Sequence, residues 1–341
     1  MSDFRIDKIT NRTGDTGPQI AGISTFSGTS GMQLPVGPTE YRGGRGRGVI
    51  FGGYNPSSPN YMNSMNYITI ATTGNGVDFG DASIVNSFSS GMGSSTRGVF
   101  KLGRGNPTYT DQLDYVTFSS GGGTSDFGSD NGRERDSCAS FADSTRGCWG
   151  GGTGADDGNI QYITMASTGD STDFGNLSLG RYMGGGAGGA SPTRGFAFGG
   201  LSPLTPTVAE KIIEYVNIQS RGNSVKFGEL TVGRRAIAAV TNSTRAVMCS
   251  GDTPATNTMD YITMASEGNA VDFGDITRQP NGYGAGCSTA TRGVIAGCDT
   301  SPKNSIDYIT FSTTGNATDF GDTLYDSYLC GSCSDSHGGL G

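Results

Sequence analysis

The stretch Tyr261–Asp275, YITMASEGNAVDFGD, decides how this chain folds, because it occurs six times with small changes. The first residues of each copy alternate bulky and polar side chains with a period of two, which predicts a half-buried β-strand. Gly-Asn or Gly-Asp then supplies a turn, since these residues tolerate positive φ, and a short second strand centred on a phenylalanine follows. Each copy is therefore predicted to form a β-hairpin. The copies begin at Tyr67, Tyr115, Tyr162, Tyr215, Tyr261 and Tyr308.

A second pattern, Arg-Gly followed by apolar residues and glycine, precedes each hairpin and predicts one more strand. It begins at Arg47, Arg97, Arg146, Arg194, Arg245 and Arg292. From the second copy on, a run of small residues such as GGGAGGA at 184–190 comes before it, so one unit has four strands. Successive repeat tyrosines are 48, 47, 53, 46 and 47 residues apart. This period with four short strands is typical of a β-propeller blade, and six copies predict six blades.

The run of small residues is expected to form the innermost strand of each blade, because the blades crowd together at the axis. Tyrosine and phenylalanine are expected to fill the space between blades. The C-terminal stretch Asp326–Ser334 reads as an inner strand with no complete repeat after it. We therefore expect residues 328–334 to complete the first blade, closing the ring and removing its exposed sheet edges. The prediction is an all-β, six-bladed propeller over 47–341, preceded by a segment, 1–46, that lacks the repeat.

Composition excludes several classes of function. The formal net charge of −8 opposes nucleic-acid binding, which needs a basic face. No stretch approaches the roughly 20 apolar residues of a membrane-spanning helix. The N-terminal residues MSDFRIDKIT contain no apolar signal region, so we expect the protein to be made in a cytoplasm.

No catalytic, cofactor-binding or metal-binding residues are predicted, and we expect a protein that is not an enzyme. The single histidine, His337, occupies an arginine position of the repeat. Paired carboxylates such as Asp272 and Asp275 suit glycoside hydrolysis, but they recur in several blades, which favours a structural task. We expect a ring of Arg–Asp pairs, for example Arg292 with Asp272 or Asp319. The seven cysteines are expected to be small buried side chains.

The loops before each repeat tyrosine differ in length and content, and variable loops on a rigid ring are where recognition usually occurs. Exposed tyrosines suit flat contacts with protein or sugar. The candidate binding residues are therefore Tyr54, Tyr61 and Tyr109. The alternative is that these loops are only solvated.

The repeat resembles the kelch repeat. The resemblance lies in the di-glycine that ends the second strand (Gly52-Gly53 and Gly199-Gly200), in the tyrosine of the third strand, and in an arginine before the first strand. That arginine is Arg181, Arg235 or Arg278 in three of the units. Phenylalanine stands where kelch repeats usually have tryptophan.

The tandem pattern of YITI, TGNA, DFGD and TRGVF also looks like repeats in virion structural proteins of tailed bacteriophages, particularly marine cyanophages. Residues 4–37 look like the leader of phage tail fibres and other appendages. The resemblance implies a homo-oligomeric virion protein, attached to other virion proteins through residues 1–46, whose propeller contacts a host surface glycan or protein. A capsid decoration protein, a carbohydrate-acting propeller enzyme and a cytoplasmic kelch-like adaptor are the alternatives.

Overall fold

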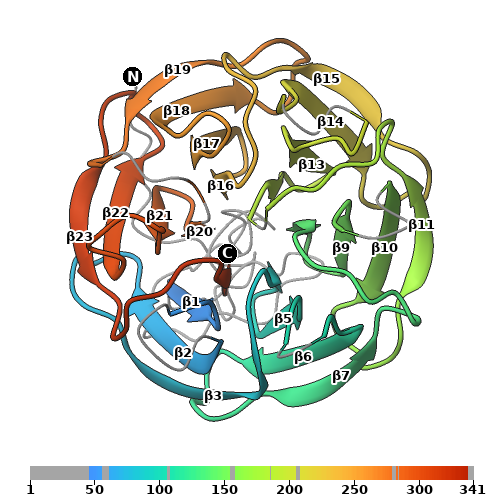
Figure 1. Cartoon of the computed structure of the whole chain (residues 1–341), viewed down its shortest axis with the longest axis vertical. Coiled ribbons are helices and arrows are strands. Elements are labelled where there is room, and N and C mark those ends of the chain that lie inside the picture. Colours follow the sequence, from blue (N-terminus) through green and yellow to red (C-terminus); the bar gives the residue numbers. More distant parts are fainter. Residues whose placement is uncertain are drawn as a thin grey trace, which may run out of the picture. The chain divides into compact units, whose positions relative to one another are not determined.

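The computed structural model shows six four-stranded antiparallel sheets arranged as a ring (Figure 1). The predicted all-β, six-bladed β-propeller is therefore confirmed. The structure describes residues 46–55, 61–105, 108–153, 158–184, 186–204, 208–278, 282 and 284–336. The predicted attachment segment, apart from Gly46, and His337 lie outside the described residues.

Each blade runs from an inner to an outer strand in chain order, except that blade 1 takes its inner strand from the C-terminal end. Blade 1 contains β24 (Gly331–Ser334), β1 (Arg47–Phe51), β2 (Met62–Thr69) and β3 (Val77–Asn86). Blades 2 and 3 contain β4 (Ser90–Gly93), β5 (Arg97–Lys101), β6 (Gln112–Thr117), β7 (Ser125–Ser129), β8 (Ala139–Ala142), β9 (Arg146–Gly150), β10 (Asn159–Thr164) and β11 (Thr172–Asn176). Blades 4 and 5 contain β12 (Gly188–Ala190), β13 (Arg194–Phe198), β14 (Ile212–Asn217), β15 (Val225–Glu229), β16 (Ala238–Thr241), β17 (Arg245–Gly251), β18 (Thr256–Thr263) and β19 (Val271–Asp275). Blade 6 contains β20 (Ala285–Ser288), β21 (Arg292–Ala296), β22 (Ser305–Thr310) and β23 (Thr318–Asp322).

The ring is closed by β24, which pairs antiparallel with β1. Gly48 lies opposite Ser334 and Phe51 lies opposite Gly331. The expected completion of the first blade by the C-terminal residues is thus confirmed. It leaves β1 with a partner on both sides, because β2 pairs with its other edge.

The repeat tyrosine and phenylalanine form an edge-to-face pair in each hairpin; in blade 5 the rings of Tyr261 and Phe273 are 5.8 Å apart. Phe273 is 2% exposed and belongs to a cluster that includes Ile309 and Phe311 of blade 6. The hairpin therefore packs its apolar face against the next blade. This contact provides the stability that an isolated two-stranded hairpin lacks.

The substitution Phe273→Ala is expected to lower the free energy of unfolding by about 3–5 kcal/mol, because it leaves a cavity between blades 5 and 6. Urea denaturation measures the change. Val271→Ala, at a side chain that is 56% exposed in the same strand, is the control and is expected to change stability little. Equal stabilities for Phe273→Ala and the unmodified protein would contradict this packing.

The Arg-Gly pattern creates a socket for the neighbouring blade. A Cβ built on Gly195 would lie 2.0 Å from the ring of Phe141, a side chain of the inner strand of blade 3. Gly98 receives the Cys333 sulfur in the same way, at 2.6 Å. At the blade 4–5 junction the inner strand has Gly189, and there Ala246 replaces the socket glycine. The inner strands therefore hold some large residues, which the sequence did not predict. These residues fit because their side chains point away from the crowded axis.

The Gly-Asn turn of each hairpin forms hydrogen bonds with the preceding blade, a contact that we call the circumferential clasp. The sequence predicted only a simple hairpin turn here. In blade 1, the N–H groups of Gly74 and Gly76 donate to the carbonyl oxygens of Phe320 and Asp322 in the outer strand of blade 6. The Asn75 side chain accepts from the N–H of Asp322 at 3.1 Å. Backbone contacts of this kind join the other five junctions, through the donors Gly122, Gly169, Gly222, Gly268 and Gly315. This circumferential clasp covers the outer strand that each blade would otherwise expose.

The repeat arginine does not form the expected pair with aspartate. The guanidinium of Arg292 lies 4.3 Å from the centre of the Tyr308 ring and donates to the carbonyl of Ile70 in blade 1 at 3.0 Å. The other five arginines combine the same two contacts, with their own tyrosine and the next blade. The prediction of Arg292 with Asp272 or Asp319 is wrong because the arginine side chain reaches across the blade junction, toward a carbonyl.

In five of the six blades, a buried polar residue before the repeat tyrosine holds the segment that arrives from the preceding blade. In blade 4, Glu214 accepts hydrogen bonds from Ser178 and Ser224 and forms an ion pair with Arg181 at 2.7 Å. In blade 5, Asp260 does the same with Thr231 and Arg234. Burial acts to raise the pKa of the Glu214 carboxyl, but Arg181 and the serine hydroxyls outweigh it and hold the pKa below its ordinary value.

The substitution Glu214→Gln is expected to lower the free energy of unfolding by about 3–5 kcal/mol, because it leaves the Arg181 charge buried without a partner. The lowered pKa stabilises the fold above the ordinary carboxylate pKa, and this contribution is lost as pH falls through the folded value. The stability gap between the two proteins should therefore narrow on acidification. Asp252→Asn, in a half-exposed pair with Arg235, is the control and should cost about 0–1 kcal/mol. Chemical denaturation at several pH values tests both.

Candidate binding face

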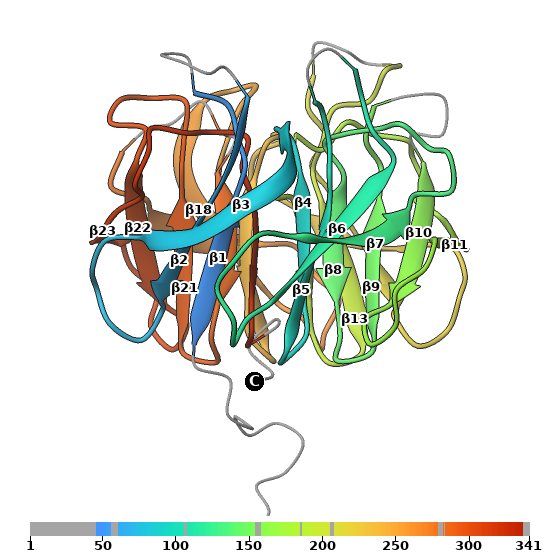
Figure 2. The same cartoon turned by 90° about the horizontal axis from the view of Figure 1, so that it is seen from below.

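The loops that differ between blades gather at one face of the ring, which we call the loop face. Each blade alternates strand direction, so the connections between its second and third strands lie at the end opposite to its other two turns. The crossings from one blade to the next lie at the same end as these loops (Figure 2). Residues of the loops and of the crossings can therefore act together on the loop face.

Tyr54 and Tyr61 are brought together, as the sequence suggested, and they gain a third partner. Their ring centres are 5.5 Å apart, and the Tyr328 ring lies 5.4 Å from Tyr54. Backbone bridges join Tyr54 to both of the other residues. Lys303 places its ammonium 4.6 Å from the centre of the Tyr328 ring. We call Tyr54, Tyr61 and Tyr328 the tyrosine cluster.

Tyr109 belongs to a second group on the loop face and lies in the loop between β5 and β6. Its side chain is 38% exposed, and the Arg104 guanidinium lies 5.5 Å from its ring centre. Tyr182, on the crossing into blade 4, contacts the Phe88 ring at 6.4 Å and the Arg235 guanidinium at 5.2 Å. Burial raises the pKa of the Tyr182 hydroxyl, and Asp136 and Tyr109 raise it further. The hydroxyl therefore stays protonated at neutral pH and is able to donate a hydrogen bond.

Sequence reasoning found Tyr54, Tyr61 and Tyr109 but missed Tyr328 and Tyr182. Both missed residues lie in the crossings between blades, and the sequence had assigned Tyr328 to the closing inner strand. A usable signal was present, because aromatic residues occur at these crossings in some units and not in others. Aromatic residues outside the repeat were the relevant pattern, whichever connection carries them.

A chain of backbone hydrogen bonds fixes the crossings at the mouth of the ring. The Phe88 N–H donates to the Leu329 carbonyl at 2.8 Å, and the Phe88 carbonyl accepts from the Ser137 N–H at 3.2 Å. Met183 donates to Ser137, and Ala236 donates to Met183. Phe88 adopts a φ of 55°, a left-handed conformation that is uncommon for a non-glycine residue. The backbone beside Tyr182 and Phe88 is therefore held in place by hydrogen bonds.

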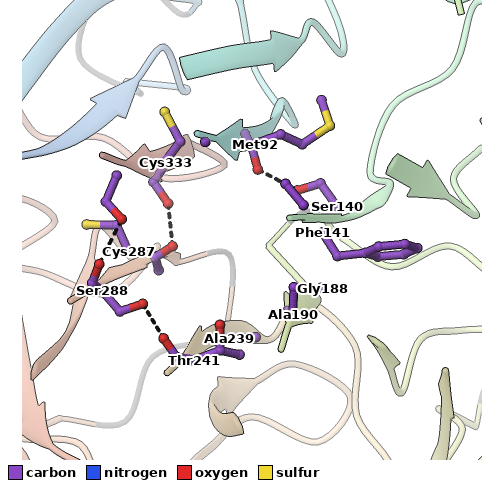
Figure 3. Close-up of a pocket in the computed structure, with 17 residues that line it drawn as sticks. Met92, Ser140, Phe141, Gly188, Ala190, Ala239, Thr241, Cys287, Ser288 and Cys333 are labelled. Carbon is purple, nitrogen blue, oxygen red and sulfur yellow. Dashed lines mark hydrogen bonds between the residues drawn. The ribbon is translucent and has the colours of Figure 1, made fainter. Parts of the chain in front are cut away.

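The centre of the ring itself offers little room for a ligand. An axial cavity of about 70 Å³ is lined mainly by glycine, alanine and serine, including Gly188, Ala239 and Ser140. Figure 3 shows the side chains of Phe141, Cys287 and Cys333 turned away from it. The Ser140 hydroxyl donates to the Gly91 carbonyl at 2.8 Å, so it is used in joining two inner strands. Pockets for organic ligands usually measure about 300–1,000 Å³.

The cysteines are all free and buried, as expected from the sequence. Burial raises the pKa of the Cys138 and Cys330 thiols to about 11 and that of Cys287 to about 12. These thiols stay protonated at neutral pH and are poor nucleophiles. Within the ranges that the structure describes, no three histidine, cysteine, aspartate or glutamate side chains are placed to hold a metal ion. No helix in those ranges has the length and apolar character needed to cross a bilayer.

The chain matches no model of a known protein family, and no curated protein resembles it at a significant level. The fold and the two aromatic groups of the loop face are therefore the observations from which a function can be inferred.

Proposed function

We propose that the protein is a non-enzymatic structural component of a bacteriophage virion, a kelch-like propeller in a tail fibre or another appendage. The loop face would bind a host surface glycan or protein, or a neighbouring virion protein. Residues 1–46 would attach the propeller to the particle, in which several copies assemble. The observation that supports the binding role is a set of partly exposed aromatic side chains on the loop face, where hydrogen bonds hold the crossings together. They are Tyr54, Tyr61, Tyr328, Tyr109 and Tyr182.

The tyrosine side chains of the loop face are pre-organised for binding. Tyrosine offers a large contact area and a hydroxyl while losing few rotamers on binding. The backbone chain through Phe88 and Ser137, together with the bridges at Tyr54, holds the rings before any ligand arrives. A partner therefore orders few side chains, which lowers the entropic cost of association.

The virion assignment draws on the likeness of the repeats and leader to phage appendage and virion proteins, and a decoration role on the capsid is the other version of it. Mass spectrometry of purified particles tests both. Finding the protein at a stoichiometry matching tail or capsid components supports the corresponding version. Absence from intact particles, with expression in infected cells, would overturn the proposal.

The binding role is tested with labelled full-length protein and intact host cells in flow cytometry. The double variant Tyr54→Ala with Tyr328→Ala is expected to bind about tenfold more weakly or worse, because it removes two of the three rings of the tyrosine cluster, which meet edge to face. Val225→Ser, at a residue 54% exposed in an outer strand away from the loop face, is the control. Unchanged binding by the double variant, or an equal loss in the control, would count against the loop face.

A further inference from the structure

A crevice between blades 5 and 6 lies on the face opposite the loop face, where the turns between first and second strands lie. Its volume is about 300 Å³, at the lower end of the range for small-molecule sites. The residues that carry the argument are Asn242, Thr244, Arg245, Thr291, Phe311 and Ser312. From the structure we propose that this crevice binds a small sugar acid, a molecule with one carboxylate and several hydroxyl groups.

The first observation is the charge of the crevice. Of the residues that the structure describes, Arg245 is the only charged one that lines the crevice, in a chain whose net charge is −8. One guanidinium nitrogen of Arg245 donates to the Phe311 carbonyl at 2.6 Å, and the group lies 5.0 Å from the Tyr261 ring centre. Among the described residues, its Nε and Nη2 have no hydrogen-bond acceptor. A carboxylate is the acceptor that matches the planar guanidinium fork.

The second observation comes from the corresponding place between blades 3 and 4, where the chain fills the space itself. There Gln219 takes the position of Ser312, and its side-chain amide donates to Asp143 and to the Thr145 hydroxyl. In the blade 3–4 crevice, a hydrogen-bonding side chain thus occupies the space that stays open between blades 5 and 6. With the short side chain of Ser312, the blade 5–6 crevice stays open.

The third observation concerns Asn242, the residue that caps the turn beside the crevice and decides whether the crevice contains a negative charge. Asp143 and Asn242 cap their turns in the same way, because one side-chain oxygen accepts from the backbone N–H groups two and three residues further on. The donors are Thr145 and Arg146 in blade 3 and Thr244 and Arg245 in blade 5. The turn is therefore compatible with either residue. Asparagine makes the open crevice acceptable to an anion, and the hydroxyls of Thr244, Thr291 and Ser312 suit the hydroxyl groups of a sugar.

Isothermal titration calorimetry with the full chain tests the proposal with glucuronate, glucose and inorganic phosphate as probes. Glucuronate is expected to bind saturably, and glucose about tenfold more weakly or not at all, because it lacks the group that pairs with Arg245. Phosphate is expected to bind more weakly than glucuronate, because it makes fewer contacts with the hydroxyls. No saturable binding of glucuronate would overturn the proposal. Phosphate binding as tightly as glucuronate would overturn the sugar-acid assignment.

Two variants locate the site without touching Arg245. Ser312→Gln should fill the crevice as Gln219 fills its counterpart, and Asn242→Asp should repel the carboxylate while keeping the turn cap. Each is expected to weaken glucuronate binding at least about tenfold with the fold intact, as checked by thermal unfolding. Gln219→Ser, which opens the other crevice beside Asp143, is the control and should add no second site. Full binding in both folded variants would show that glucuronate binds elsewhere and overturn the assignment.

Discussion

Removal of residues 326–341 is expected to abolish cooperative folding, the largest effect of any change considered for this chain. The deletion takes away β24, so β1 loses the partner of its inner edge. It also removes the Ser332 and Ser334 hydroxyls, which donate to Gly286 and Ser288 carbonyls of blade 6 at 2.8 Å each. An open ring with an unpaired edge is prone to associate with other chains. Thermal unfolding and size-exclusion chromatography measure the outcome.

A second truncation separates closure from mere length. A chain that ends at Ser336 keeps β24 whole and should unfold like the full protein. Adding a synthetic peptide of residues 326–336 to the longer deletion should restore part of the cooperative transition, because the peptide can occupy the empty edge of β1. A deletion lacking 326–341 that stayed monomeric and equally stable would refute closure by β24.

The substitution Gly195→Ala is expected to destabilise the protein by about 1–3 kcal/mol or more, through overpacking. The added methyl would meet the ring of Phe141, whose position is fixed by the inner strand of blade 3. The φ of Gly195 is not positive, so the cost is one of space and not of backbone conformation. Urea denaturation of the purified variant measures it.

The blade 4–5 junction supplies the test of this explanation. There the chain itself combines Gly189 in the inner strand with Ala246 in the socket. Combining Phe141→Gly with Gly195→Ala copies that arrangement, so the double variant should be more stable than the sum of the single effects predicts. Additive effects in this double-mutant cycle would show that Phe141 and the socket do not interact.

Local patterns in the sequence predicted the blades well, because each strand is encoded by its own residues. The alternation before Phe273 and the spacing of the repeat tyrosines were enough to place the hairpins, and an inner strand without a following repeat predicted the closure. The clasp escaped notice because its partners are far apart in the chain. Asn75 meets Asp322 only when the first and last blades come together.

Two other errors have physical reasons. We paired Arg292 with aspartate because the two have opposite charges. The tyrosine ring face and the neighbouring carbonyl stabilise the guanidinium without a carboxylate. Glu214 and Asp260 were overlooked because a polar residue in an alternating strand is normally read as facing solvent. Both are fully buried, since they face the segment arriving from the preceding blade.

The candidate site was predicted in part for a related reason. Tyr54, Tyr61 and Tyr109 lie in loops that are visibly unequal, whereas Tyr328 and Tyr182 lie in crossings whose length varies less. The contact between Tyr54 and Tyr328 depends on ring closure, which brings the C-terminal crossing beside blade 1. No stretch of sequence contains that arrangement.

The circumferential clasp also bears on how such a chain can arise and change by duplication. Both halves of the clasp lie on one hairpin, since the Gly-Asn turn reaches back to the preceding blade and the Asp-Phe-Gly strand receives the turn of the following one. A duplicated repeat therefore carries its own means of joining both neighbours. Gene segments of this length can be copied, exchanged or lost as whole modules, while the connecting loops diverge without disturbing the joints.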